Sequence, residues 1–349
     1  MDVRLSPEQV ALRDAAAQMV DRLGLHGVTD LDDAERTAKL DAAVDATGWR
    51  ELRAASEEGG APLASAVEVA VVAEELGRGL ADVPFLGATL AAELRRLAGA
   101  PPTTRPETVV LEADLGRLVA ISDVAEVDGK SLAPDAQGAR NALVVMTRAD
   151  GHVVGAVALG DPAQGPDLSR PVACVQPPGR ATVLEGQSRL LTSDDLVTWH
   201  ALGLAVTSAD LVGVMRGALT LATEYARARR QYGATIGSFQ AVQHLLADAL
   251  VAMEGARSIA LHAAWAVDAL PAPGALAAAA AAKAYAARAA RAVCETAIQV
   301  HGGIGNTWEC LAHVFLRRAL LSTDVLGGVG PSLERVLVAQ GIGAGDGLR

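Results

Sequence analysis

The sequence predicts an α+β fold in three parts: an N-terminal helical domain, a small middle β domain and a C-terminal four-helix bundle. Apolar residues recur at helical spacing over the first hundred residues, and again from about residue 193 onward. Between these regions lie short β-rich runs separated by Gly, Pro and Asp, a pattern typical of strands joined by turns. The expected domains are therefore residues 1–103, 104–192 and 193–349.

Four helices are expected in the first hundred residues. Ser6-Pro-Glu is a helix-start pattern, because the hydroxyl caps the helix, proline fits its first position and the acid suits its first turn. Glycines at positions 48 and 77 are expected to end the second and third helices. The proline pair Pro101-Pro102 is a plausible domain boundary. The expected helices cover Ser6–Arg22, Leu31–Thr47, Leu63–Leu76 and Leu86–Leu97.

The middle region, from Thr108 to about Gly186, contains five β-rich runs with turn residues between them, so we expect a small antiparallel β domain or barrel. The C-terminal part begins with the capping run Ser193-Asp194-Asp195. After a first helix and an arginine-rich corner, helices are expected over Phe239–Leu270 and Ala275–Val300, with a last segment from Trp308 to about Val325. Alanine dominates here because it favours helix and lets neighbouring helices approach closely.

The composition is that of a folded protein, and the length is typical of an enzyme. The 349 residues are 51% hydrophobic, which supplies material for a core. The net charge of −11 argues against a nucleic acid or an anionic membrane surface as the partner, so small molecules and proteins are expected instead. The chain lacks a basic-then-apolar leader, and Lys283 and Arg288 interrupt the alanine-rich run Ala275–Ala290. We therefore expect a soluble protein.

The cysteines indicate neither a metal site nor a disulfide framework. Their spacing matches no metal motif, and their odd number does not form complete pairs. A reduced, cytoplasmic setting with structural cysteines is expected for Cys174, Cys294 and Cys310.

The stretch Ala226–Asp248 predicts a helical hairpin: the end of one helix, a glycine-containing turn at Gly233–Gly237 and the start of the next helix. Arginine binds phosphate oxygens well because its planar fork donates in pairs. Arginines at a helix end are more often a solvated face favoured by the helix dipole, so the corner alone does not identify a phosphate site. The corner carries Arg227, Arg229, Arg230 and Gln231.

Two strings together resemble a known family. The first is Arg229-x-Gln231-aromatic-Gly, followed by Ser238-Phe-Gln-x-x-Gln243 and Leu-Ala-Asp248; the second is Gln299-Val-His-Gly-Gly-Ile-Gly305. In this order they resemble the C-terminal helical domain of flavin-dependent acyl-CoA dehydrogenases. The likeness covers about the last 150 residues, is looser in the N-terminal part and is poor in the middle. It implies FAD as cofactor and an acyl-CoA thioester as substrate.

The resemblance also implies roles for particular residues. The arginine at position 229 contacts the flavin pyrophosphate in the family, and Gln299, Gly302 and Gly303 pack against the adenosine, all reaching across a dimer interface into a neighbour's flavin site. Glycines let a backbone approach a phosphate, and backbone N–H groups near a helix end attract anions. The glycines could instead simply cap a helix, and Phe239 could be plain core. Gln231, Tyr232, Phe239 and Gln243 complete the matching set.

The family's catalytic base is missing at both of its known places. Counting from Arg317 and from Gln299 places the common glutamate position at Leu326, and counting back from Gly233 places the position of a second branch at Gly203. Neither residue can accept a proton, so no catalytic residue is assigned. Asp324 and Glu309 are the acidic residues that the sequence offers as substitutes for the missing base.

The flavin cradle of the middle domain also looks eroded. In the family a Thr-Glu-Pro-type loop and a tryptophan-containing strand hold the flavin ring. Here Val109–Gly116 is at most a remnant of that loop, and no tryptophan occurs between Trp49 and Trp199.

Two classes of function remain from the sequence. The first is a subunit that completes the flavin site of a full-length acyl-CoA dehydrogenase partner, resembling the short subunits of α2β2 actinobacterial enzymes that act on steroid side-chain thioesters in lipid metabolism. The second is a catalytically silent scaffold or CoA-ester binding protein. The matching residues Arg229 and Gln299 favour the first, because a pure scaffold has no need of them. The identity of the acyl group rests on analogy alone.

Overall fold

The computed structural model describes residues 4–56, 60–122 and 125–342. The N-terminal part is helical, as expected, and two of its helices begin with a capping box, at Ser6 and at Ser65. Gly48 ends the second helix in the left-handed conformation (φ 67°). The helices are α1 (Pro7–Leu23), α2 (Ala34–Thr47), α3 (Ala66–Arg78) and α4 (Leu86–Leu97), with short 3-10 turns at Val28–Asp32 and Trp49–Glu51.

Gly77 does not end the third helix, contrary to the expectation, because α3 continues to Arg78. A Cβ atom at residue 77 would lie 2.5 Å from the backbone carbonyl oxygen of Asp210. The glycine therefore serves close packing of α3 against the central helix rather than termination.

The middle part forms a mixed sheet and not the purely antiparallel one expected. Strands β4 (Asn141–Arg148), β5 (Gly151–Ala158) and β7 (Thr182–Val183) pair antiparallel, but β1 (Glu107–Val109) and β2 (Ala120–Ser122) both run parallel to β4. The two short strands lie end to end along one edge of β4, opposite Asn141–Leu143 and Val145–Thr147. A separate pair joins β3 (Leu132–Ala133) to β6 (Ala173–Cys174). Turn residues predict hairpins but carry no information about parallel pairing, which explains the error.

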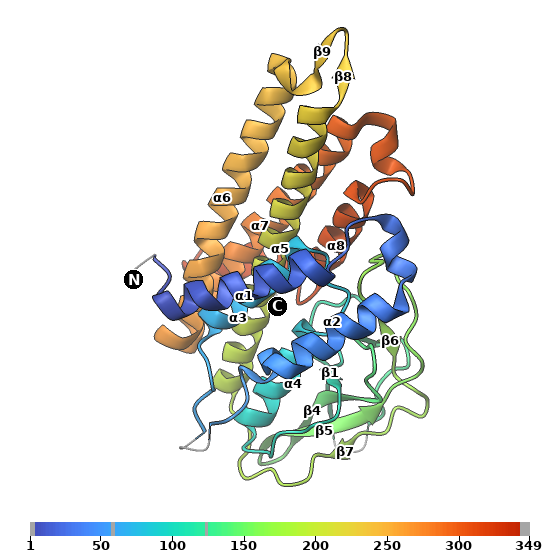
Figure 1. The fold of residues 1–349 in the computed structure, drawn as a ribbon. Helices are drawn as coiled ribbons and strands as arrows, with labels where there is room; N and C mark the ends of the chain where they lie inside the picture. Colours follow the sequence, from blue (N-terminus) through green and yellow to red (C-terminus); the bar gives the residue numbers. More distant parts are fainter. Residues whose placement is uncertain (1–3, 57–59, 123–124, 343–349) are drawn as a thin grey trace.

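The C-terminal part is built on three long helices, with the small β8–β9 hairpin projecting beyond the ends of α5 and α6 (Figure 1). Helix α9 lies beyond the last segment expected from the sequence. The elements are α5 (Ser193–Ala228), β8 (Arg230–Gln231), β9 (Ala234–Thr235), a 3-10 turn (Ile236–Ser238), α6 (Gln240–Ala269), α7 (Ala272–His301), a second 3-10 turn (Gly302–Asn306), α8 (Ala312–Asp324) and α9 (Val329–Ala339).

Helix α5 is the centre of the core. By length and composition it is the one described helix that could cross a membrane, yet 94% of its most apolar window is buried inside the protein. Close approach explains part of this burial, since a Cβ at Gly213 would lie 1.9 Å from the carbonyl oxygen of Glu74 on α3. The α+β class with its helical C-terminal domain is confirmed.

A buried ionic network joins the three parts of the chain. Asp210 of α5 accepts hydrogen bonds from Arg318 Nη2 (2.6 Å) and Ser322 Oγ (2.6 Å) of α8. Arg318 also donates to the carbonyl oxygen of Ala81 (2.8 Å), and Arg170 of the middle part donates to Ser322 (2.6 Å). Burial alone would raise the pKa of Asp210, but the charges of Arg318 and Arg170 lower it to about 2.

This network predicts a large effect of one substitution. Arg318→Met leaves the buried Asp210 without the guanidinium that donates two hydrogen bonds to its Oδ1, so the free energy of unfolding should fall by about 3–5 kcal/mol. The measurement is urea unfolding followed by circular dichroism. Arg291→Met is the matched control, because Arg291 forms an exposed ion pair with Glu295 on α7 and its loss should not change the curve measurably. Equal unfolding curves for the two variants would contradict a structural role for the network.

Candidate functional site

The two motif strings meet at one end of the C-terminal bundle. Arg229 caps the end of α5, and Gly302 follows the end of α7. The ring of Tyr225, one turn before Arg229, stacks on that of His301, the last residue of α7, with 4.4 Å between ring centroids. His301 is held in turn by a 2.7 Å contact between its Nδ1 and the Ala297 carbonyl oxygen. Segments about seventy residues apart in the sequence are thus joined at one surface, next to the β8–β9 hairpin.

The polar side chains of this surface point to solvent. Arg229 is exposed, and within the described residues its guanidinium has neither an ion pair nor a hydrogen bond. Gln299 is exposed as well. Gln231 donates to the Arg230 carbonyl oxygen (2.9 Å) and Gln243 to that of Gly237 (3.0 Å), which stabilises the hairpin and the turn after it. Arg229 is therefore an available cation at a fixed position.

The two aromatic residues of the set are also exposed. Tyr232 is 95% exposed, and its ring meets the edge of Phe239 at a centroid distance of 6.3 Å. Phe239 is 37% exposed, so it is not a core residue of this chain. Exposed aromatic rings beside a free arginine are typical of a surface that another molecule covers.

The glycines of the second string have different structural roles. Gly302 has φ 67° and caps α7, as the alternative interpretation requires. Gly305 packs against the Ile298 carbonyl oxygen, 2.8 Å from where a Cβ would lie. A Cβ at Gly303 would meet nothing within 4 Å, and its φ is not in the left-handed region. This chain alone therefore does not explain the glycine at position 303.

The two expected base positions face each other. A Cβ at Gly203 would lie 2.1 Å from Cδ1 of Leu326, and Leu326 is fully buried. Two independent counts along the sequence thus lead to one point in space. That point is filled by hydrocarbon, so it lacks both a proton acceptor and room for a substrate carbon.

The remnant of the cradle loop closes on the same point. The backbone N–H of Leu326 donates to the carbonyl oxygen of Leu115 at 2.7 Å, and both residues adopt left-handed φ angles of 64° and 61°. The Leu115 side chain belongs to the same core cluster as Leu326. The Leu115 loop and the Leu326 turn are therefore in direct contact.

A buried lysine holds the turn that carries Leu326. Lys283 of α7 donates from Nζ to the carbonyl oxygens of Val325 (2.9 Å) and Ser322 and to Oγ1 of Thr207 (3.0 Å). These acceptors include carbonyl groups that the end of α8 leaves without helical partners. Burial lowers the pKa of Lys283 to about 7, and nearby Asp210 limits this shift.

His200 lies one turn before the 203 position on α5. Its Nε2 atom is buried without a partner, while the ring is hydrogen-bonded to the Leu326 backbone. Burial, reinforced by the charges of Arg335 and Lys283, lowers its pKa to about 3. His200 is therefore neutral at physiological pH.

The two substitutes considered for the missing base do not reach the Leu326–Gly203 contact. Asp324 ends α8 with an exposed side chain, and Glu309 is exposed in the loop before α8. No metal-binding cluster of His, Cys, Asp or Glu occurs in the described part of the chain.

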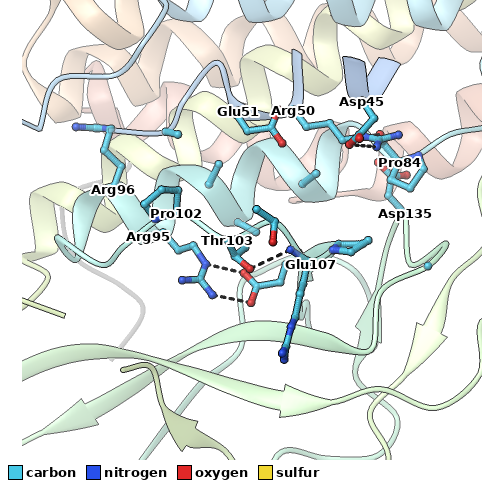
Figure 2. Close-up of a pocket in the computed structure, with 18 of the residues that line it drawn as sticks. Asp45, Arg50, Glu51, Pro84, Arg95, Arg96, Pro102, Thr103, Glu107 and Asp135 are labelled. Atoms are coloured by element: carbon cyan, nitrogen blue, oxygen red, sulfur yellow. Dashed lines mark hydrogen bonds and ion pairs between the residues drawn. The ribbon is translucent and has the colours of Figure 1, made fainter. Parts of the chain in front are cut away.

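A cavity of about 290 Å³ lies elsewhere, between α4, α2 and the strap of residues 100–107 (Figure 2). Two of its arginines are paired within the chain: Arg95 forms two 2.7 Å hydrogen bonds to Glu107, and Arg50 pairs with Asp41 and donates to the Pro84 carbonyl oxygen (2.8 Å). None of the motif residues lines it.

Sequence reasoning missed the residues around Leu326. Lys283 was noted only as an interruption of an alanine run, although one lysine within an apolar helix is itself a signal of a buried, partnered cation. Leu115 and His200 carry no comparable signal, because only the fold brings them to the turn.

The pKa of His200 predicts acid sensitivity. Its folded value of about 3 lies below its ordinary value of 6.5, so the unfolded chain binds the proton first and stability is lost as pH falls from 6.5 toward 3. Between pH 7 and pH 5 this group should lower the free energy of unfolding by about 2 kcal/mol. Urea unfolding at both pH values measures the loss, and His200→Phe should lack this component. A variant as acid-sensitive as the wild type would refute the assignment.

Comparisons with known proteins show which family this chain resembles. A family model described as acyl-CoA dehydrogenase, C-terminal domain, matches residues 202–331. The chain is 32% identical to acyl-CoA dehydrogenase IpdE2 of Mycobacterium tuberculosis over 284 residues, which cover 80% of each protein. It is 28% identical to acyl-CoA dehydrogenase IpdE2 of Mycolicibacterium smegmatis, covering 95% of this chain and 98% of that protein.

Solved structures agree. A chain of the ChsE4–ChsE5 complex from Mycobacterium tuberculosis superposes with a TM-score of 0.79 at 25% identity, covering 98% of this chain and 99% of that one. A chain of the Tcur3481–Tcur3483 steroid acyl-CoA dehydrogenase variant gives 0.79 at 24% identity, covering 96% and 98%. The resemblance found in the sequence, including its likeness to the short steroid-type acyl-CoA dehydrogenases of actinobacteria, is confirmed. The chain belongs to the acyl-CoA dehydrogenase family.

Proposed function

We propose that this chain is a subunit of an FAD-dependent acyl-CoA dehydrogenase and completes the flavin site of a full-length partner. The observation that carries the proposal is the contrast between two regions of α5. Near its start, Leu326 fills the base position opposite Gly203, whereas its far end presents an unpaired Arg229. Residues 203 and 229 lie about 40 Å apart along the helix. The residues at the Arg229 end, which resemble the family's contacts to the FAD nucleotide, therefore serve a flavin other than one beside Leu326.

The residues at the hairpin end fit the nucleotide part of FAD. Arg229 offers a free guanidinium for a pyrophosphate, which is worth about 1.5–3 kcal/mol as a charge-assisted contact. Gly302 and Gly303 leave open space where a side chain would stand. Gln299, Tyr232 and Phe239 are exposed around them. The bound flavin would accept the β-hydride of the acyl-CoA, while this chain orients the nucleotide.

The residues near Leu326 do not fit a flavin ring, because the Leu115 loop and the Leu326 turn are hydrogen-bonded to each other. The partner therefore has to supply the base that removes the α-proton and the β domain that holds the ring. The heteromeric complexes among the structural relatives support a second, different subunit in an α2β2 assembly. A steroid side-chain CoA ester is the proposed substrate, by analogy with the relative named a steroid acyl-CoA dehydrogenase.

Flavin stoichiometry tests this proposal. The chain purified alone should bind little FAD, and the complex with its partner should contain one FAD per two chains. Leu326→Glu should not add a second active site, because a carboxylate without a flavin lacks a hydride acceptor. The measurements are flavin absorbance per complex and turnover per flavin. Two flavins per heterodimer, or a doubled rate in the variant, would contradict the proposal. Either result would mean that the chain is an ordinary acyl-CoA dehydrogenase with a flavin site of its own.

Arg229→Ala in the assembled complex should weaken FAD binding about ten- to a hundredfold, because one charge-assisted phosphate contact is lost from an exposed position. The fold should be unaffected, as the side chain has no partner within the described residues. FAD retention over a dilution series measures the change. Arg140→Ala is the control, since that arginine is 87% exposed and lies on the β domain. Equal retention in both variants would make Arg229 a surface charge only.

A further inference from the structure

An aromatic stack connects the two helices whose ends carry the motif strings. The rings of Tyr225 and His301 lie with 4.4 Å between centroids and 26° between planes. His301 is buried, and Tyr225 is half-buried against the core that α5 shares with α7. Among the described residues this is the one ring-to-ring contact that joins α5 to α7. The stack is therefore a direct link between the Arg229 end and the Gly302 end.

His301 sets the orientation of this stack. Its Nδ1 lies 2.7 Å from the Ala297 carbonyl oxygen, and because a carbonyl oxygen can only accept, Nδ1 carries the proton and donates it. This bond to the preceding turn of α7 holds the plane of the imidazole ring. The turn after α7 packs on the same residue, since a Cβ at Gly305 would lie 3.0 Å from the His301 Cβ. Tyr225 therefore stacks on a ring that is fixed to α7 and to the glycine turn that follows it.

Arg229 is held by the other half of the stack. Its backbone N–H donates to the Tyr225 carbonyl oxygen (2.8 Å), and its own carbonyl oxygen accepts from the Ile236 N–H (2.8 Å). Within the described residues its guanidinium has no partner. The fold thus fixes the backbone of Arg229 through Tyr225 and leaves the side chain available to a ligand.

The neighbouring core contacts set the orientation of the two helices less strictly. Within four residues of the stack, the buried core positions are mostly alanines: Ala222 and Ala226 on α5, and Ala297 with Val300 on α7. Alanines let helices approach closely, but they have no side chain long enough to interdigitate. They therefore fix the distance between α5 and α7 better than their rotation or offset, which leaves the Tyr225–His301 stack to set these.

We propose that the Tyr225–His301 stack positions Arg229 relative to Gly302 and Gly303, and so sets the geometry in which this chain meets a dinucleotide. This role rests on the function proposed above. The pyrophosphate and the adenosine belong to one molecule, so the arginine and the glycines must be correctly spaced to contact both. Both aromatic residues are positioning residues: Tyr225 acts through Arg229, whose N–H it binds, and His301 acts through Gly302, which follows it in the chain.

FAD binding by the assembled complex tests this role. Tyr225→Leu removes the ring at a half-buried position and should raise the dissociation constant about tenfold, because Arg229 loses its fixed place. Tyr225→Phe keeps the ring, and the lost hydroxyl has no hydrogen bond within the described residues, so FAD should bind within about twofold of the wild type. Flavin fluorescence over a dilution series measures each constant.

Trp265→Leu is the matched control. The Trp265 ring contacts that of His262 within α6, with 5.7 Å between centroids, near the end of this helix that lies away from the hairpin. The variant therefore also removes a ring pair from a half-buried position, and it should leave FAD binding unchanged.

A double-mutant cycle separates positioning from simple packing. If Tyr225 acts through Arg229, the double variant Tyr225→Leu/Arg229→Ala should bind FAD within about twofold of Arg229→Ala alone. If the stack only packs the helices, Tyr225→Leu should lower Tm without changing FAD binding, or the two losses should multiply in the double variant. Either of these results would overturn the proposal.

The single variants distinguish this role from the function on which it rests. Weaker FAD binding in Arg229→Ala but not in Tyr225→Leu would overturn the positioning role and leave the proposed function standing. Unchanged binding in both variants would overturn both. Should Tyr225→Leu fail to assemble, His301→Gln decides in its place, because it keeps a donor toward Ala297 and removes the ring. FAD binding equal to the wild type in His301→Gln would then overturn the proposal.

Discussion

The turn at Leu326 is the constraint on which the centre of the molecule depends. Its left-handed backbone is held from several sides: the N–H group donates to Leu115, Lys283 binds the preceding carbonyl oxygens, and His200 is hydrogen-bonded to its backbone. Its side chain faces Gly203, where any Cβ would collide with it. A leucine at φ 64° is strained by itself, so the surrounding contacts must more than offset that strain.

In the proposed function, this arrangement changes the role of the fold rather than dismantling it. In an acyl-CoA dehydrogenase the same region has to hold a carboxylate, a substrate carbon and a flavin ring. Here leucine side chains and a direct loop-to-turn contact occupy that region, and a buried ionic network around Asp210 still joins the three parts of the chain rigidly. Such rigidity suits the proposed role, in which Arg229 and the glycines are presented to a neighbouring subunit at a fixed place.

The sequence predicted the helices and the hairpin end well, because those signals are local. Ser6 caps α1, Thr47 ends α2, and the two motif strings lie where helices end. The two positions reached by counting, Leu326 and Gly203, touch in the structure, and their match to the family's base positions stays a prediction. The parallel pairing of β1 and β2 with β4 was not predictable from turns, and Gly77 was taken for a terminator because its real partner, the Asp210 carbonyl, is distant in sequence. The contact between Leu115 and Leu326 likewise exists only through tertiary structure.

In the proposed function, this chain lacks a flavin site beside Leu326 and contributes to a flavin on another subunit. An experimental structure of the purified complex with FAD tests this most directly. We expect flavin density only on the partner's β domain, with the Arg229 guanidinium at the pyrophosphate of that flavin and the hydrogen bond from Leu326 to Leu115 intact. A flavin ring lying between Leu115 and Leu326 of this chain would contradict it.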